Sequence, residues 1–520
     1  MKRVITLIAF LTMSVPAVVK ATIWRVNNTT GINANFTSLQ TANDDGNVVN
    51  GDTLHLEGSS IEYSTCTFNK RLVVIGPGYF LSENPKTSVN ALHALVDAIF
   101  LSSGASGSTF IGLTARRFEV SANDVTIQRC RILQYVYPDL NYSNMSIVQN
   151  FFDNTTTLST GISTFWALPT GVVVNNNIFK KILYMPGNSS YTFQECKNNV
   201  FDVPVVWQND PSLRFFAASF ENNIITNSSA VVDINGISDF VATPLSSVNH
   251  NVSITTNTQF GTANDNIVVS NMTANLFVPA NISNSTDGKY QLKANSPGSG
   301  NGSDGTDRGA FGTSSAFTQY TLSGLAPIPV VYEINTTGIA NTVSGLPVTI
   351  KARTNNGGVS NIVSAEYFFD TDPGFGNGNQ VTFTNPSPDG TFSFDIPANQ
   401  LLSGNHKLFI RVRDNIGADV SLTAWKNVNV IIVPVSVEKL DRPNYRVYPV
   451  PAQKFLNVEL SRTTQEEAQL SLTDISGRVL QQVVTHGRTA TLMLDYPSGV
   501  YFLSVTGNGS TSTEQIIINN

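Results

Sequence analysis

The sequence predicts an all-β protein in which a stack of short parallel strands precedes two β-sandwich domains. Only 13% of the 520 residues are charged, against about 25% in typical soluble domains. The polarity comes instead from Asn, Ser, Thr and Gly, which favour tight turns over long surface helices. A short apolar motif recurs between about residues 120 and 226, and longer alternating strands follow from about residue 330.

The N-terminus has the features of a signal peptide. A positive start and an apolar run, Val4–Val19, precede a small-residue cleavage site before Thr22. A membrane anchor is the alternative, but the run is short, contains Pro16 and lacks stop-transfer charges after it. We therefore expect export to remove Met1–Ala21, and we do not expect an integral membrane protein.

The repeated motif is apolar, two residues, Asn, one residue, apolar, and it recurs every 20 to 27 residues. Its copies are Ile147-Asn150-Phe152, Val174-Asn177-Phe179, Cys196-Asn199-Phe201 and Phe220-Asn223-Ile225, with an earlier copy, Ile127-Cys130-Ile132, that has Cys in place of Asn. This period predicts a solenoid whose stacked coils share one core. We expect each Asn to take a left-handed conformation at a bend and to bond along the stack.

These features resemble the right-handed parallel β-helix family of secreted bacterial proteins, of pectate-lyase-like type. Residues 51–56 and 72–79 look like the first coils of such proteins, and residues 290–297 and 305–312 look like their closing segment. The resemblance covers about residues 22–313 and implies the fold; a globular β-sandwich is the competing fold.

The three cysteines, Cys66, Cys130 and Cys196, are expected to be buried apolar residues. In the β-helix alignment Cys130 and Cys196 fall three coils apart, about 14 Å at the usual strand spacing. A disulfide needs Cα atoms within about 7 Å, so these two should not pair.

Pro327 and Pro329 mark a break, and we expect a linker over residues 314–329. Alternating strands separated by Gly and Asn turns predict an immunoglobulin-like β-sandwich over residues 330–433. The pieces 366–378 and 404–414 resemble a module common in exported multidomain bacterial proteins.

Within this module, Asp370, Asp372 and Asn377 offer hard oxygen ligands at a spacing that could hold Ca²⁺. The run lacks the loop length and terminal Glu of an EF-hand, and a turn that caps a hairpin is the preferred interpretation. We expect no other cofactor.

The final segment, residues 434–520, carries the most specific pattern. Its motifs are Tyr448–Ala452, Leu456–Val458, Leu472–Val479 and Tyr496–Leu503. They closely resemble the C-terminal sorting domain of the type IX secretion system, although Val450 stands where the family usually has Asn and Glu514 where it commonly has Lys. The resemblance implies contact with the type IX secretion machinery, export across the outer membrane, and surface attachment or release. A plain terminal sandwich is the alternative.

The candidate catalytic residues form the main charged cluster of the repeat. They are Arg116, Arg117, Glu119, Asp124, Arg129 and Arg131. Many β-helix proteins cleave acidic polysaccharides with an Arg or Lys base, or with paired carboxylates. The aligned columns here are mostly neutral, however, and a solvated charged surface is the simpler interpretation.

The candidate ligand-binding residues are aromatic side chains in or beside the insertions between coils, where rings could stack on sugars. They are Trp166, Trp207, Tyr135 and Tyr137. A net charge of −6 and the lack of a basic stripe exclude a nucleic-acid partner. We therefore predict a surface or secreted protein that binds carbohydrate or another surface polymer without cleaving it. A polysaccharide lyase or glycoside hydrolase and an adhesin-like rod are the alternatives.

Overall fold

The computed structural model divides the chain into two compact units, Met1–Val433 and Pro434–Asn520. The residues that it describes are 21–153, 162–163, 169–180, 183–184, 193–202, 213–215, 219–226, 232–234, 248–254, 264–313, 318–416, 420–433, 445–461, 467–507 and 510–519. Apart from Ala21, the expected signal peptide lies outside these residues.

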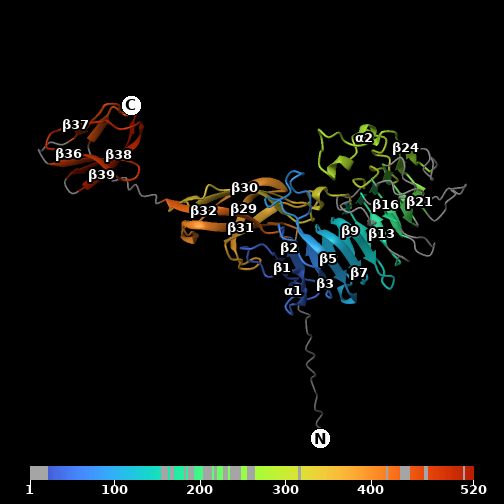
Figure 1. Cartoon of the computed structure of the whole chain (residues 1–520). Coiled ribbons are helices and arrows are strands. Elements are labelled where there is room, and N and C mark those ends of the chain that lie inside the picture. Colours follow the sequence, from blue (N-terminus) through green and yellow to red (C-terminus); the bar gives the residue numbers. More distant parts are fainter. Residues whose placement is uncertain are drawn as a thin grey trace, which may run out of the picture. The chain divides into compact units, whose positions relative to one another are not determined.

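The first unit begins with a parallel β-helix (Figure 1), which confirms the predicted fold class. In order of pairing, the described strands of sheet A are β1 (Ile23–Val26), β2 (Thr53–Leu56), β4 (Val73–Ile75), β6 (Thr109–Ile111), β8 (Thr126–Gln128), β10 (Ser146–Val148), β13 (Val173–Asn175), β16 (Glu195–Lys197), β19 (Phe220–Glu221) and β22 (Val248–Asn249). Those of sheet B are β3 (Cys66–Phe68), β5 (Leu95–Leu101), β7 (Thr114–Val120), β9 (Arg131–Pro138), β11 (Phe151–Phe152), β14 (Ile178–Phe179), β17 (Val200–Phe201), β20 (Ile224–Ile225), β23 (Val252–Ser253) and β24 (Ile267–Val268). A branch of sheet B leaves the second half of β9 through β12 (Ile162–Ser163), β15 (Leu183–Tyr184), β18 (Leu213–Phe215) and β21 (Val232–Ile234).

The strand register follows the repeat in the sequence. Val174 pairs with Ile147 and Cys196 in sheet A, and Phe179 pairs with Phe152 and Phe201 in sheet B. The stack continues for two coils beyond the recognised copies, through Asn251 and Asn266. The motif did not predict the Asn251 coil because Ser253 stands at its final apolar position, and the Asn266 coil follows after only 15 residues, below the earlier period.

The asparagines form the expected ladder along the stack. Oδ1 of Asn177 accepts a hydrogen bond from the backbone N–H of Asn150 at 2.8 Å, and its Nδ2 donates to the carbonyl of Ile147 at 2.8 Å. The same two bonds recur at Asn150, Asn199, Asn223, Asn251 and Asn266. All of these side chains are buried, so each replaces water for two backbone groups of the preceding coils.

The left-handed position lies one residue before the ladder asparagine, which corrects the expectation. Arg129, Gln149, Asn176, Asn198, Asn222 and His250 have φ between 53° and 60°. The left-handed residue bends the chain at the corner of the coil. This bend points the side chain of the following asparagine into the coil, where its amide can bond to the backbone of the preceding coil.

Apolar side chains from both sheets fill the coil. The rings of Phe152, Phe179 and Phe201 stack with centroids 4.5 Å and 5.0 Å apart. All three cysteines are buried and free. Cys130 occupies the ladder position of its coil, and burial raises the pKa of its thiol to about 12.

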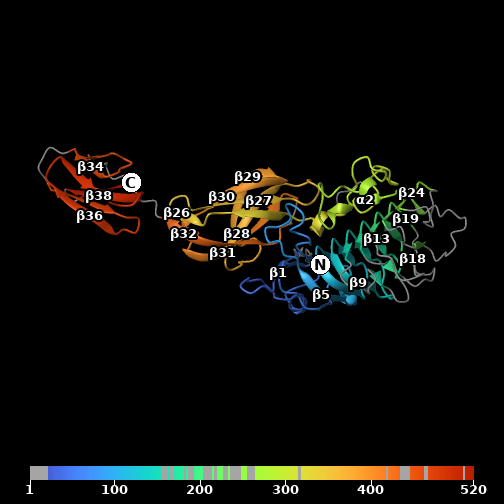
Figure 2. The ribbon, with the colours of Figure 1, turned by 45° about the horizontal axis from the view of Figure 1, so that its top comes forward.

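A return segment within residues 272–326 covers the outer side of this stack (Figure 2). It contains the helix α2 (Met272–Asn275) and the 3₁₀ turns η2 (Gly288–Tyr290) and η3 (Leu322–Gly324). The outward apolar column Phe151, Ile178, Val200, Ile224 and Val252 packs beneath it. Gly309, at φ 83°, lies so close to Ile224 that a Cβ would clash, which is why glycine stands there.

The described residues of the expected linker, 318–329, pack closely on the coil. Tyr320 and Leu325 are each 2% exposed, and the carbonyl of Leu325 accepts a hydrogen bond from Arg129 Nη1 at 2.7 Å. This stretch leads from the return segment into the next domain while it stays packed on the coil. The expected domain boundaries remain a prediction.

A β-sandwich completes the first unit. One sheet contains β25 (Val330–Asn335), β27 (Leu346–Arg353) and β30 (Asp389–Ile396). The other contains β26 (Ile339–Asn341), β32 (Ala424–Val433), β31 (Gly404–Asp414), β28 (Ile362–Phe369) and β29 (Asn379–Ser387). Alternating residues of both sheets, such as Val348, Ile350, Leu408 and Ile410, form their shared core. The remaining short helical elements of the unit are α1 (Leu39–Asp44), η1 (Ser103–Ala105) and η4 (Ala398–Gln400).

The second unit is a smaller β-sandwich with its own core. Its sheets are β33 (Tyr445–Tyr448), β34 (Phe455–Leu460) and β37 (Thr489–Met493), and β36 (Val479–Thr485), β35 (Ala468–Thr473), β38 (Gly499–Gly507) and β39 (Ser510–Ile518). Leu456, Leu470, Leu492 and Leu503 are fully buried between them. Across the described parts of both units, no helix has the length and apolar character needed to cross a membrane.

Candidate functional site

Five side chains gather on the outer face of β5, β7 and β9, and we call them the aromatic face. They are Phe100, Arg117, Glu119, Tyr135 and Tyr137. The register places Arg117 beside Tyr135, and Glu119 between Phe100 and Tyr137. All five are half-buried. Arg117 and Glu119 were predicted as catalytic candidates, and Tyr135 and Tyr137 as sugar-binding candidates. The strand pairing brings these four residues together and adds Phe100.

A bulge in the pairing of β7 with β9 lets consecutive arginines avoid the core. The register shifts between Ala115 and Arg117. Ala115 and Phe118 both point inward and are fully buried, so Arg116 and Arg117 lie between two core positions. A bulge commonly re-aims a side chain in this way.

The charges of the aromatic face are satisfied within it. Arg117 Nε contacts Glu119 Oε1 at 3.2 Å, and its guanidinium lies 5.7 Å from the Phe100 ring centroid. The Tyr135 hydroxyl donates to the same Glu119 oxygen at 3.2 Å. Burial and the neighbouring Glu119 raise the pKa of Tyr135, so its hydroxyl stays protonated at neutral pH.

Arg116 belongs to a neighbouring ion pair. Its Nε and Nη2 donate to the two carboxylate oxygens of Glu62 at 2.7 Å and 2.9 Å, and Asp97 lies 3.6 Å away. This bidentate bond raises the pKa of Arg116. The guanidinium is therefore a fixed surface cation and not a base.

A second group, the charged row, follows the outer side of sheet B: Arg131, Asp153, Lys180 and Asp202. Arg131 Nε donates to Asp153 at 2.8 Å, and Lys180 forms an ion pair with Asp202. Arg131 continues the outward apolar column, and its guanidinium stacks 4.7 Å from the ring centroid of Phe80. This stacking lets a cation occupy an otherwise apolar column.

The return segment contributes to the charged row. The hydroxyl of Tyr290 donates to Asp202, and Thr226 Oγ1 donates to the other carboxylate oxygen at 2.7 Å. Burial raises the pKa of Asp202, but Lys180 and Tyr290 lower it more, so the carboxyl is ionised at neutral pH. Burial and the nearby Arg131 lower the pKa of His93.

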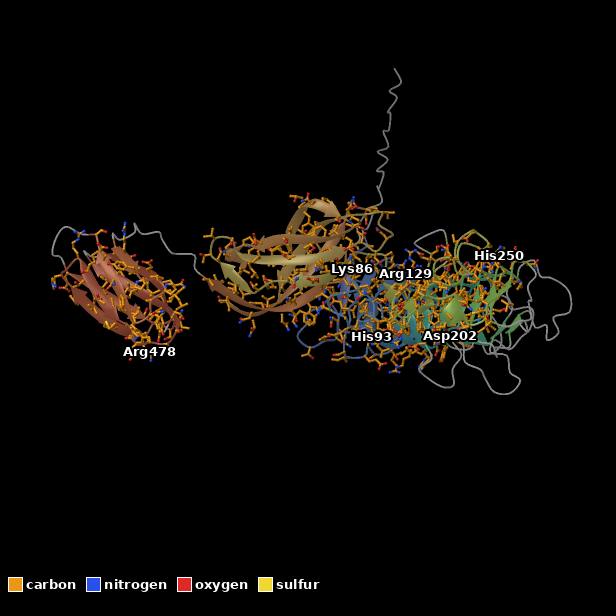
Figure 3. The ribbon with its side chains drawn as sticks, turned by 90° about the horizontal axis from the view of Figure 1, so that it is seen from above. Lys86, His93, Arg129, Asp202, His250 and Arg478 are labelled. Carbon is orange, nitrogen blue, oxygen red and sulfur yellow. The ribbon has the colours of Figure 1, made fainter. Side chains whose placement is uncertain are left out.

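Arg129 and Asp124 lie away from both groups. Arg129 is 2% exposed at a left-handed corner, bonded to Gln149 Oε1 at 3.2 Å and to the return segment. Burial lowers its pKa to about 10. Figure 3 shows Arg129 and His250 toward one edge of the coil, and His93 and Asp202 toward the other. Asp124 is exposed at a different corner of the coil from Arg129, and it accepts a hydrogen bond from Asn144 at 3.0 Å.

The proposed calcium ligands lie in the turn between β28 and β29. Asp372 accepts from Arg25 Nη1 at 2.8 Å and from Arg411 Nη2 at 2.6 Å, and neither guanidinium is exposed. Asp370 contacts His406 Nδ1 at 2.7 Å. A cation at Asp372 would have to displace both guanidinium groups.

Asn377 donates from Nδ2 to the carbonyl of Pro373 at 3.2 Å, within the same turn. Among the described residues, no three His, Cys, Asp or Glu side chains are grouped closely enough to hold a metal ion. Trp166 and Trp207, the two predicted tryptophan ligands, lie outside the described residues.

Apart from Arg131, the residues of the charged row were not predicted from the sequence, although a signal for them was present. Asp153, Lys180 and Asp202 each follow an aligned phenylalanine of the repeat. Extending the alignment by one column would have found them. Tyr290 has no such signal, because only the return of the chain brings it beside Asp202.

Comparison with known proteins identifies the end of the chain. Residues 446–519 match the family described as the secretion system C-terminal sorting domain. The match supports export by the type IX secretion system to the cell surface or beyond, and thereby contact with its machinery. No curated protein matches the chain.

Solved structures resemble only parts of the chain. Dimeric latent PorU from Porphyromonas gingivalis is 13% identical with a TM-score of 0.14, over 37% of this chain and 20% of its own. The FN1–FN3 domains of chicken CNTN1 are 19% identical with a TM-score of 0.15, over 36% of this chain and 66% of their own. The CD2-binding domain of CD58 is 12% identical with a TM-score of 0.12, over 35% and 96%. The chain thus spans about a fifth of PorU, and similarities this low do not bear on function.

Proposed function

We propose that the chain is a type IX-exported protein whose β-helix binds a neutral carbohydrate polymer outside the cell without cleaving it. The observation that carries the proposal is the aromatic face. Phe100, Tyr135 and Tyr137 present half-buried rings on a rigid sheet, with the carboxylate of Glu119 among them. Rings and polar groups held in place bind sugar faces with little loss of conformational entropy.

Charge balance favours a neutral polymer over a uronate. Arg116 is paired with Glu62, Arg117 with Glu119 and Arg131 with Asp153. A polyanion would have to compete with these carboxylates for each guanidinium. A neutral glycan needs only ring stacking and hydrogen bonds.

The same pairs speak against cleavage. A lyase needs an available base beside a group that neutralises the sugar carboxylate, and these arginines are already engaged. Asp153 and Asp202 are two coils apart, about 9.6 Å at strand spacing, near the separation of an inverting carboxylate pair. However, Lys180 and Tyr290 hold the pKa of Asp202 below its usual range, which does not suit a general acid, and the other carboxylate, Asp153, is ion-paired with Arg131.

Binding should be tested with the purified first unit, residues 22–433, against neutral and uronate-containing glycans. Tyr137→Ala and Tyr135→Ala should each weaken binding about threefold to tenfold, the equivalent of about 0.5–1.5 kcal/mol for one ring contact. Tyr142→Ala is the matched control, because Tyr142 lies in the turn after β9 and outside the aromatic face.

Two results would decide against this proposal. Glycan cleavage that Arg131→Ala abolishes would establish the lyase alternative. Failure to bind any neutral glycan, with unchanged folding, would leave the rod as the better description of the β-helix.

A further inference from the structure

The start of the β-helix holds a buried carboxylate against a backbone nitrogen. Oδ1 of Asp52 accepts from the N–H of Thr22 at 2.8 Å, and Oδ2 accepts from Trp24 Nε1 at 2.9 Å and from the N–H of Val49 at 3.0 Å. Asp52 is 1% exposed. Its three partners are neutral donors in the full-length chain, so this buried carboxylate lacks a balancing charge among them.

Thr22 is also the residue that follows the expected signal-peptide cleavage site. Both Ala21 and Thr22 are exposed, so the preceding segment can leave the coil without disturbing its core. Strand β1 begins at the next residue and pairs in sheet A with β2, which starts directly after Asp52, while Val26 also bridges to Phe36. The Thr22 nitrogen is therefore held at the outermost described strand of sheet A.

We propose that Asp52 is the receptor site for the mature N-terminus: cleavage between Ala21 and Thr22 creates an α-ammonium that forms an ion pair with this carboxylate. An endopeptidase of the export pathway hydrolyses the amide with one water. The water oxygen ends in the new carboxylate of Ala21, and its two hydrogens join the one already on the Thr22 nitrogen. A neutral hydrogen bond becomes a charge-assisted one, and such bonds are about twice as strong.

The neighbouring groups do not titrate with the ammonium. Trp24, His55 and Arg413 line the cavity beside Thr22, and Arg71 lies next to Gly51. Burial, Arg411 and Arg25 lower the pKa of His55 to about 3, so it is neutral near pH 7. Guanidinium groups stay charged throughout this range. Among these described neighbours, the α-amine alone changes charge between pH 7 and 9.

Four chains test the proposal: residues 22–520 beginning with Thr22, the same chain preceded by Gly-Ser, and both chains with Asp52→Asn. At pH 7 the chain that begins with Thr22 should melt about 1–3 °C above the Gly-Ser chain, and the difference should vanish with Asp52→Asn. Equal melting temperatures, or a difference that Asp52→Asn leaves intact, would overturn the proposal.

The pH dependence has a defined sign. An α-amine ordinarily has a pKa of about 7.7–8.0, and the ion pair raises it in the folded chain. The advantage of the Thr22 chain should be complete below about pH 7.5 and should be lost as the pH rises through the raised value. An advantage that instead grows with pH would contradict an ammonium.

Two measurements keep the test valid if Asp52→Asn does not fold. Mass spectrometry of the exported protein should find Thr22 at its N-terminus, and any other start would refute the site. An amine-reactive reagent at pH 7 should acylate the native Thr22 amine at least tenfold more slowly than the urea-unfolded one. Equal rates would exclude the ion pair.

Discussion

At the scale of single residues, the β-helix depends on side chains that serve two coils at once. Each ladder asparagine accepts from one backbone group of the preceding coil and donates to another, and the left-handed residue before it sets the angle. A buried group that loses such a partner keeps its desolvation cost, about 1–3 kcal/mol. The ladder thus fixes the register of coils whose lengths vary.

Asn177→Ala should lower the stability of the first unit by about 3 kcal/mol. The change leaves the N–H of Asn150 and the carbonyl of Ile147 without their partners inside the coil, each costing about 1–3 kcal/mol. Denaturant unfolding of residues 22–433 measures the effect. Asn47→Ala is the control, because Asn47 is an exposed turn residue in the same unit. Similar small losses for both variants would contradict the role assigned to the ladder.

Phe179→Ala should cost about 3–5 kcal/mol, as for other fully buried aromatic residues. Its ring lies between two parallel rings, so truncation opens a cavity that neither neighbour can fill by sliding. Phe179→Leu keeps most of the volume and should cost clearly less. Thermal unfolding of both variants checks the order, and equal losses would argue against stacking as the cause.

At the scale of elements, the turn between β28 and β29 joins the sandwich to the first strand of the coil. Arg25 on β1 bonds Glu57 at 2.6 Å and Asp372 at 2.8 Å, while Arg411 on β31 bonds Asp372 and Glu366. Both guanidinium groups are unexposed and lie over aromatic rings of the sandwich. The two elements therefore share one buried network of charges.

Asp372→Ala should destabilise the first unit by about 3–5 kcal/mol, because it leaves two buried guanidinium groups without their common carboxylate. Denaturant unfolding measures the loss. Asp395→Ala, an exposed aspartate of the same sandwich, should change stability by no more than about 0.5 kcal/mol. A loss at Asp372 as small as at Asp395 would show that the network does not hold the two elements together.

The same network should make the first unit sensitive to acid. Burial raises the pKa of Asp372, but Arg411 and Arg25 lower it more, so its folded value lies below the ordinary 3.8. Its contribution is therefore present above about pH 4 and is lost as the pH falls through the lowered value. Melting curves between pH 2 and 6 should show this loss in the native chain and lack it in Asp372→Ala. Parallel curves would assign the acid sensitivity to other carboxyls.

At the scale of the whole molecule, the sorting domain is a separate unit with its own core. The first unit does not need it to complete a sheet among the described strands. The matched sorting domain and the first unit are thus different parts of the chain, each with its own core. This separation allows a sorting domain to be removed without loss of the exported part.

Deletion of residues 438–520 should leave a folded protein in the periplasm. The deletion removes the matched sorting domain and spares the whole first unit. Cell fractionation with protease protection locates the truncated chain, and fusion of residues 438–520 to an unrelated exported passenger is the positive control. Normal amounts of truncated protein at the surface would contradict the sorting role of residues 438–520.

The sequence by itself determined the fold class, the coil register and the sorting domain. These depend on patterns within a coil or a strand, such as Val174, Asn177 and Phe179, where neighbours in sequence share one structural period. Only the tertiary structure decided what lies outside the coils. One example is the bulge that turns Arg116 and Arg117 outward, and another is the pairing of Tyr135 with Arg117. A third is the contact of Arg25 with Asp372, which are 347 positions apart in the sequence. Such contacts depend on the stacking of whole elements, and no local period in the sequence records them.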